Sequence, residues 1–211
     1  MHTLLSVLTV SLLTMFSTSA SRAEDNALVV IAADQSNSMF DSGHVNIQRE
    51  ALITAFANYL VDCNNLEVRY IAWGGEAIAP VSAKLTDQAA VIDYANRLWP
   101  VSHAILQSTN HHRGVEAALK QLNASDAKQK VLIFTTDGLS NEPDNWNLGR
   151  KIPADVLVFT ISLGSREISD FVSKNIQPAT GGKHYHANNA DELTARFEEA
   201  FTAAKTELCL S

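Results

Sequence analysis

Two polar clusters, each at the end of an apolar run, hold the residues of this sequence that could do chemistry. The stretch VVIAADQSNSM (29–39) sets Asp34, Ser36 and Ser38 directly after apolar residues. About a hundred residues later, the run IFTTDG (133–138) sets Asp137 after another apolar run. Carboxylate and hydroxyl oxygens are hard donors, so this set suits Mg²⁺, Mn²⁺ or Ca²⁺ rather than zinc or copper.

The spacing of the first cluster favours one shared site. In Asp34-x-Ser36-x-Ser38, alternate side chains can project to one side while the strand turns into its loop. Two acids balance a dication without saturating it, and Mg²⁺ otherwise keeps water in its octahedron. One coordination position therefore stays open to an outside oxygen, for which a carboxylate of a partner protein is the natural occupant. Alone, an acid and serine cluster more often caps a helix.

These clusters need strands to position them, and the sequence predicts such strands. Apolar, β-branched runs alternate with helical patterns, which is typical of βαβ units and a mostly parallel sheet. The run 76–85 follows Gly74-Gly75 and contains Pro80, which favours an antiparallel edge strand. Strands are expected at 27–34, 66–75, 76–85, 130–138, 154–164 and 181–187.

Helical spacing of apolar residues separates these strands. Helices are expected over 45–62, 86–99, 113–122 and 165–176, with a long amphipathic helix at 193–208. The predicted fold is therefore a single doubly wound α/β domain of about six strands with helices on both faces. Ligands bind such sheets beyond the carboxyl ends of the strands, where both polar clusters lie.

Composition limits the classes of function. The chain has 211 residues, 46% hydrophobic and 18% charged, which fits one globular domain. The formal net charge of −7 and the pI near 5.4 argue against nucleic-acid or anionic-membrane binding, because both require a basic face.

The first residues are typical of an export signal. An apolar segment from Leu4 to Phe16 is followed by small residues ending at Ala23. That segment is shorter than the roughly 20 residues that span a bilayer, so cleavage after Ala23 is favoured over an uncleaved tether. We expect a signal peptide at 1–23, a mature domain at 24–211 without a stable membrane span, and a periplasmic or extracellular location.

The only two cysteines are Cys63 and Cys209, at the predicted ends of the first and last helices. An exported protein can keep a disulfide. If the two helices are neighbours with their C-terminal ends on the same side, the pair could close. Two independent thiols are the alternative.

The quoted residues resemble a known family. VVIAADQSNSM, STNHHRG and IFTTDG are similar to the von Willebrand factor A domain and its metal-ion-dependent adhesion site. The resemblance implies the strand order 3-2-1-4-5-6 with strand 3 antiparallel. It also implies a metal held by Asp34, Ser36, Ser38, Thr109 and Asp137. Asn37 stands where the family usually has glycine. The stretch IQREALITAFAN and the export signal suggest a bacterial secreted branch.

Three functions follow from these observations. The first is a non-enzymatic, cation-dependent binding protein whose partner supplies an Asp or Glu to the metal. The second is a metal-dependent hydrolase, for example of phosphate esters, with Asp34 as nucleophile or ligand and His111 or His112 as acid or base. No second acid follows Asp34 two residues on, which weighs against it. The third is a scaffold domain that binds partners without metal.

Two further groups have both a functional and an ordinary interpretation. Asn110, His111, His112 and Arg113 follow Thr109 and could form a rim that contacts the partner, although a solvated helix start explains them equally simply. His184 and His186 lie two apart on a predicted strand, so both rings share one face and could contact zinc or copper. No third ligand is visible, which favours a surface pair on an edge strand.

Overall fold

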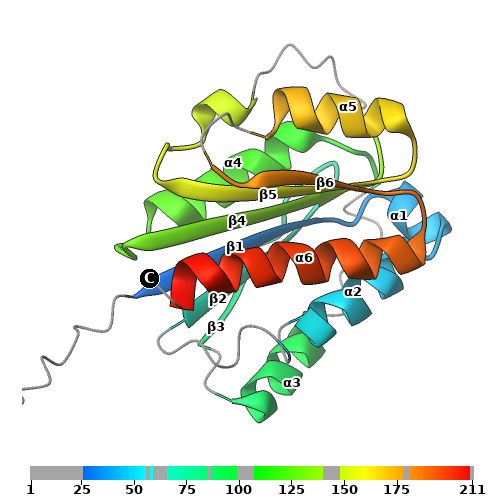
Figure 1. Ribbon diagram of the computed structural model, residues 1–211. Helices are drawn as coiled ribbons and strands as arrows, with labels where there is room; N and C mark the ends of the chain where they lie inside the picture. Colours follow the sequence, from blue (N-terminus) through cyan, green and yellow to red (C-terminus); the bar gives the residue numbers. More distant parts are fainter. Residues whose placement is uncertain are drawn as a thin grey trace, which may run out of the picture.

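The computed structural model describes residues 26–55, 58, 66–84, 87–98, 107–139, 148–177 and 181–209. Within these residues the chain forms a six-stranded sheet in the order β3-β2-β1-β4-β5-β6, with helices on both faces (Figure 1). All neighbouring strands are parallel except β3, which runs antiparallel to β2. The predicted fold class, the strand order and the antiparallel third strand are confirmed.

The elements lie close to their predicted positions. The strands are β1 (Ala27–Asp34), β2 (Leu66–Trp73), β3 (Val81–Lys84), β4 (Gln129–Thr136), β5 (Val156–Leu163) and β6 (Lys183–Ala187). The helices are α1 (Asn37–Asp41), α2 (His44–Ala55), α3 (Gln88–Arg97), α4 (His111–Asn123), the 3-10 helix η2 (Leu148–Lys151), α5 (Arg166–Asn175) and α6 (Ala190–Cys209).

Several helix starts differ from the prediction by one to three residues, and two differences concern the segments that carry the polar clusters and Thr109. A short helix, α1, occupies the serine-containing stretch that was expected to be a loop, and Gly43 with a φ of 75° separates it from α2. Helix α4 begins at His111, two residues before the predicted start, because the Asn110 side chain accepts a hydrogen bond from Arg113 N and so caps it.

The sheet is buried on both faces, and β1 lies at its centre. All eight residues of β1 are buried, as its unbroken apolar run predicts. Successive side chains point to opposite faces. Val29 and Ile31 pack in the core with α2, α3 and α6, whereas Leu28 and Val30 pack in the core with α4 and α5.

This arrangement places a topological switch point between β1 and β4. From β1 the chain continues to α2 on one face, and from β4 it continues to η2, which packs in the core of the other face. In sheets of this kind, ligands bind outside the carboxyl ends of neighbouring strands whose connections leave to opposite faces. The two polar clusters end these two strands and therefore meet at that point.

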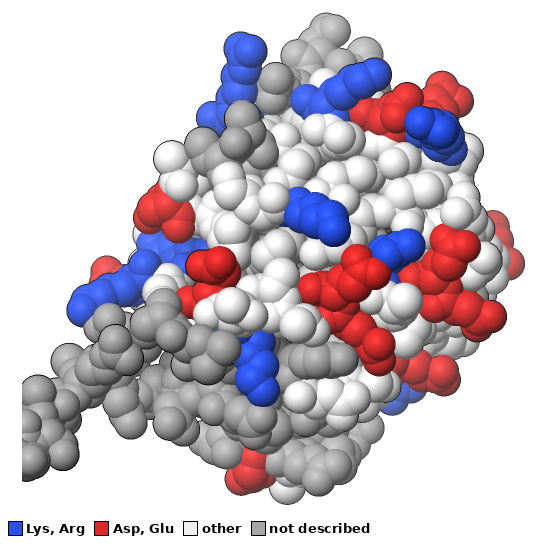
Figure 2. Space-filling view, in the orientation of Figure 1, with Lys and Arg blue, Asp and Glu red and all other residues white. Residues whose placement is uncertain are grey.

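On the face seen in Figure 2, the lysines and arginines of the described residues are dispersed among neutral and acidic side chains. Acidic side chains gather over α6, which carries Asp191, Glu192, Glu198, Glu199 and Glu207. Among the helices described here, none has the length and apolar character needed to cross a bilayer.

Candidate metal centre

Three segments bring the predicted site residues to the carboxyl edge of the sheet. Asp34 is the last residue of β1, and Ser36 and Ser38 follow it at the start of α1. Asp137 follows β4 directly, and Thr109 lies in the loop that leads into α4. The chain thus delivers each residue from an element whose end is fixed by the sheet or by a helix cap.

Asp34 is fully buried, and both of its carboxylate oxygens accept hydrogen bonds. Oδ1 accepts from the backbone N of Ser36 at 2.8 Å, and Oδ2 accepts from Thr136 Oγ1 at 2.7 Å. The backbone of Asp34 is also held, since Gln48 Nε2 donates to its carbonyl at 3.3 Å. The orientation of this carboxylate is therefore set by three elements: the start of α1, the end of β4, and α2.

The second cluster joins the first through one short hydrogen bond. Ser38 Oγ donates to Asp137 Oδ1 at 2.6 Å, although the two residues are 99 positions apart. Ser36 Oγ and Ser38 Oγ lie 3.1 Å from each other. Asp34 and Ser36 are buried and Asp137 is almost covered, whereas Ser38 is exposed. The cluster consequently opens to solvent on the side of Ser38.

Thr109 comes to the same place from a third direction. A Cβ built on Gly138 would lie 3.3 Å from Thr109 Oγ1 and 3.7 Å from Ser38 Oγ, so both hydroxyls border one small space beside Gly138. The loop that carries Thr109 is anchored to the end of β2, because Asn110 N donates to Gly74 O at 3.2 Å. The glycine turn after β2 thus contributes to the position of Thr109.

The electrostatics of the cluster favour a cation. Burial, and then the neighbouring charge of Asp137, raise the pKa of Asp34 to about 7, against the lowering effect of its bonds from Thr136 and Ser36. A positive ion beside these oxygens would relieve both causes. The donor set consists of two carboxylates and three hydroxyls, which fits a hard divalent ion. Among the described residues, no trio drawn from His, Cys, Asp and Glu could hold a metal, so hydroxyl ligands are essential to any such site.

Several residues that have no predicted role hold this cluster together. Thr136 bonds Asp34, and Thr135 Oγ1 donates to Gln48 Oε1 at 2.7 Å, which ties β4 to α2. His44 Nδ1 lies 3.3 Å from Asp137 Oδ2 and 2.6 Å from Ser42 Oγ. The sequence does show the two threonines at the polar end of the second buried strand, whereas only the fold brings Gln48 and His44 to the site.

The four residues proposed as a partner-contact rim differ in their exposure. Asn110 and His111 are buried, so of the four only His112 and Arg113 present side chains at the surface. His111 stacks on Phe171 with ring centroids 5.2 Å apart, and its Nε2 lies 3.1 Å from Gly138 O. Burial lowers the pKa of His111 to about 4. His111 is therefore a buried side chain that packs beside the site, not a surface contact for a partner.

The predicted disulfide and leader lie outside the part of the chain that is described. Cys63 is not among the described residues, and nothing is described of the Cys209 side chain. The helices concerned are neighbours, since α2 packs beside α6 (Figure 1). The bridge between Cys63 and Cys209 and the signal peptide at 1–23 both stay predictions.

Comparisons with known proteins agree with this geometry. Residues 29–200 match the family model of the von Willebrand factor type A domain. No match was found among curated proteins.

Solved structures with the same fold include proteins of surface appendages. The PilB minor pilin from Streptococcus sanguinis has a TM-score of 0.67 at 13% identity, covering 90% of this chain and 63% of that one. The pilus adhesin SpaC from Lactobacillus rhamnosus GG has a TM-score of 0.66 at 14% identity, covering 87% and 30%.

A third is proximal thread matrix protein 1 from the mussel byssus, solved with a zinc-occupied MIDAS motif. Its TM-score is 0.63 at 18% identity, with 86% of this chain and 46% of that chain covered. The chain spans less than two thirds of the length of each of these three proteins. At such identities the likeness concerns the fold.

Proposed function

Because the chain belongs to the von Willebrand factor type A domain family, we propose that it is an exported protein-binding domain whose contact with its partner depends on a divalent cation. Mg²⁺, Mn²⁺ or Ca²⁺ would be held at the sheet edge, and an Asp or Glu of the partner would complete the coordination. The signal peptide 1–23 would direct residues 24–211 to the periplasm or the cell exterior. The proposed ligands are Asp34, Ser36, Ser38, Thr109 and Asp137.

The observation that carries this proposal is the 2.6 Å hydrogen bond from Ser38 to Asp137. It joins two clusters that are distant in sequence, and it does so beside the hydroxyls of Ser36 and Thr109. Serine and threonine oxygens are weak ligands on their own, so their gathering around two acids has little structural purpose unless a cation is shared.

Each residue would have a distinct task at such a site. Asp34, held by Ser36 N and Thr136, would supply negative charge from a fixed position behind the ion. Ser38 and Thr109 would offer neutral oxygens, which leave the ion enough positive charge to attract an outside carboxylate. The exposure of Ser38 leaves an approach from solvent on that side. The ion itself would supply the charge that the partner's carboxylate recognises.

The names of the similar structures support a role in adhesion. They include a minor pilin, a pilus adhesin and a byssal matrix protein, and the last is described with zinc at this motif. In the present chain the donors are all oxygens, so a harder ion is the better match.

The geometry gives less support to a hydrolase. A general acid or base must reach the reacting group, but His111 is buried against Phe171 and Gly138. His112 lies 3.1 Å from Glu116 on its own helix. We therefore propose a binding function without catalysis.

Thermal unfolding of the metal-stripped full chain tests the metal dependence. Added Mg²⁺ or Mn²⁺ should raise the melting temperature, because a ligand of the native state stabilises it. Ser38→Ala should abolish most of that rise. Ser125→Ala, on the loop at the opposite end of the sheet, should leave it unchanged. If neither ion changed the melting temperature of the wild-type protein, the proposal would be refuted.

Affinity capture from the protein's own host tests the partner. Proteins that stay bound to the chain in Mg²⁺ and are released by a chelator are the candidate partners. Replacing an exposed Asp or Glu of a captured partner by Asn or Gln should then prevent binding. Capture that is equally strong in chelator would instead favour the metal-free scaffold.

A further inference from the structure

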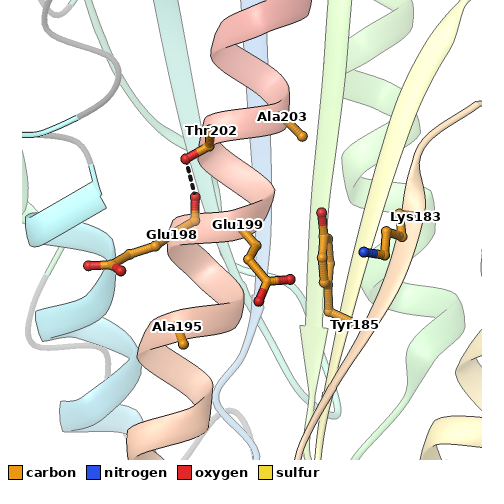
Figure 3. A pocket seen from close by; sticks show the side chains of 7 residues that line it. All are labelled: Lys183, Tyr185, Ala195, Glu198, Glu199, Thr202 and Ala203. Carbon is orange, nitrogen blue, oxygen red and sulfur yellow. Dashed lines mark hydrogen bonds between the residues drawn. The ribbon is translucent and has the colours of Figure 1, made fainter.

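The second group of chemistry-bearing residues lies on β6, the outermost strand of the sheet. His184 and His186 are two residues apart, so their side chains share one face of the strand. Tyr185 points the opposite way, into a groove of about 550 Å³ between β6 and α6, where the Lys183 ammonium lies 4.7 Å from its ring centre (Figure 3). The two histidines therefore face α5, away from that groove.

Neither histidine is a simple surface side chain. Both are half-buried, and the polar side chains that line them come from β5 and α5. The sheet register sets Thr160 beside His184 and Ser162 beside His186. The surface pair expected from the sequence is instead part of a polar network.

The hydrogen bonds around His184 determine which of its nitrogens carries the proton. Gln177 Nε2 donates to the carbonyls of Val158 at 3.0 Å and Gly181 at 3.3 Å, so Gln177 Oε1 is turned toward Thr160. Thr160 Oγ1 donates its only proton to that oxygen at 3.0 Å. It can therefore only accept from His184 Nδ1, which is 2.9 Å away. His184 thus carries its proton on Nδ1 and a lone pair on Nε2.

The same reasoning fixes His186 in the opposite tautomer. Asn188 Nδ2 donates to Glu192 Oε2 at 2.8 Å, which leaves Asn188 Oδ1 as an acceptor. That oxygen lies 3.2 Å from His186 Nε2, so the proton of His186 is on Nε2. The lone pair of His186 is consequently on Nδ1.

Both lone pairs point to the same place. Ser162 Oγ lies 3.3 Å from His184 Nε2 and 3.1 Å from His186 Nδ1. Ser169 Oγ, on α5, lies 3.0 Å from His184 Nε2. A serine hydroxyl has one proton, so Ser162 can donate to His186 Nδ1 while Ser169 donates to His184 Nε2, and the two hydroxyls thus mark the space that both lone pairs face.

We propose that these side chains form a second metal site, which binds Zn²⁺ or Cu²⁺ through His184 Nε2 and His186 Nδ1. Imidazole nitrogens suit these ions, in contrast to the hard oxygens at the sheet edge. Metal-binding histidines normally donate their other N–H to a protein acceptor, as His184 does to Thr160 and His186 does to Asn188. Ser162, Ser169 or water would complete the coordination.

Nitrogen-15 NMR of the wild-type full chain tests the preorganised tautomers and the ligand atoms together. The metal-free protein should show the proton of His184 on Nδ1 and that of His186 on Nε2. One equivalent of Zn²⁺, added with Mg²⁺ in excess, should shift His184 Nε2 and His186 Nδ1 most. The reverse tautomers, or zinc that leaves both nitrogens unshifted, would overturn the proposal without any variant.

Copper binding to variants gives an independent test. The Cu²⁺ electron paramagnetic resonance spectrum of the wild type should show coupling to two imidazole nitrogens. His184→Gln and His186→Gln should each remove one and weaken binding more than about tenfold, and Thr160→Val should weaken it by about 10- to 100-fold. Tyr185→Phe is the matched control, since it keeps a ring on the opposite face of the same strand.

The two proposed sites can be told apart in the same experiments. Ser38→Ala should leave copper binding unchanged, and His184→Gln should leave the Mg²⁺-dependent rise in melting temperature unchanged. Copper affinity retained in a folded His184→Gln, His186→Gln double variant would contradict the second site alone.

Discussion

Asp34 combines two features that both disfavour its ionised form in the absence of a metal: complete burial and the nearby negative charge of Asp137. Both raise its pKa, to about 7 from a usual value of 3.8. The carboxyl is thus favourable to the folded state below pH 3.8, and that contribution is lost as the pH rises through 7. Above pH 7 the ionised side chain destabilises the metal-free protein.

The Asp34→Asn variant should separate the stability of the protein from its metal response. The amide is nearly isosteric and carries no charge, so at pH 8 the metal-free variant should be more stable than wild type by about 1–3 kcal/mol. Its response to Mg²⁺ should disappear, because the buried negative charge is gone. Urea unfolding with and without Mg²⁺ measures both effects.

Asp126→Asn is the control for that variant, since Asp126 is an exposed acid on the loop between α4 and β4, at the other end of the sheet. It should keep the Mg²⁺ response and change stability little. If Asp34→Asn were still stabilised by Mg²⁺ as strongly as wild type, Asp34 would have no part in the site.

Gly138 offers a test of the space between the hydroxyls. An alanine Cβ there would lie 3.3 Å from Thr109 Oγ1 and 3.7 Å from Ser38 Oγ, which is tight at Thr109 without a severe clash. We expect Gly138→Ala to fold but to displace the Thr109 hydroxyl, and so to bind Mg²⁺ about tenfold more weakly. Isothermal titration calorimetry measures this, and an unchanged affinity would show that the ion does not use this space.

At the scale of helices and strands, the sequence predicted what depends on local pattern. The apolar run of β1 and the Gly74-Gly75 turn before the edge strand were sufficient to place both strands. Helix starts were less predictable. Asn110 extends α4 by using its side-chain oxygen as a cap, and a cap is recognised only when the helix position is already known.

The start of β6 depends on two consecutive glycines with different constraints. A Cβ on Gly182 would lie 1.7 Å from Val158 O, and the φ of 81° is unfavourable for other residues. At Gly181 the φ is 67°, but a Cβ would only approach the flexible Leu157 side chain, at 3.2 Å. Of the two glycines, therefore, only Gly182 would set an added Cβ against the backbone of β5.

Substitution of these glycines should therefore give unequal effects. Gly182→Ala should destabilise the protein by about 3 kcal/mol or more, because the strand must move away from β5. Gly181→Ala should cost about 1–2 kcal/mol, the penalty for a left-handed backbone conformation. Chemical denaturation measures both. Equal losses at the two positions would mean that backbone conformation alone, and not the contact with Val158, limits this turn.

At the scale of the whole molecule, the proposed ligands were named from the sequence, but their supporting contacts were not. Asp34 and Ser38 share a short motif, and Asp137 follows a recognisable strand. By contrast, Gln48 and His44 reach the cluster only because α2 crosses beside the ends of β1 and β4. Neither residue belongs to a recognisable sequence motif, so their contacts with the site could not be predicted from the local sequence.

Three titrating groups, two of them buried and one half-buried, give the metal-free protein opposing responses to acid. Burial lowers the pKa of His111 and of His184 to about 4 from 6.5. The unfolded chain therefore binds more protons than the folded chain between pH 6.5 and 4, and stability falls as the pH falls through that window. Asp34 acts in the opposite sense, because its raised pKa lets the folded state take up a proton between pH 7 and 3.8.

Comparison of wild type with Asp34→Asn in chelator should reveal this cancellation. The variant has only the histidine contribution, so between pH 6.5 and 4.5 it should lose about 2 kcal/mol more stability than wild type does. His111 should provide most of the variant's loss, since His184 is partly exposed and its effect is weakened by solvent. Urea unfolding at half-unit steps of pH measures both curves. All titrating groups other than Asp34 are common to the two proteins, so the difference between the curves reports Asp34 alone. Parallel curves would mean that Asp34 ionises in the folded state at an ordinary pH. Its burial beside Asp137 would then cost the metal-free protein little.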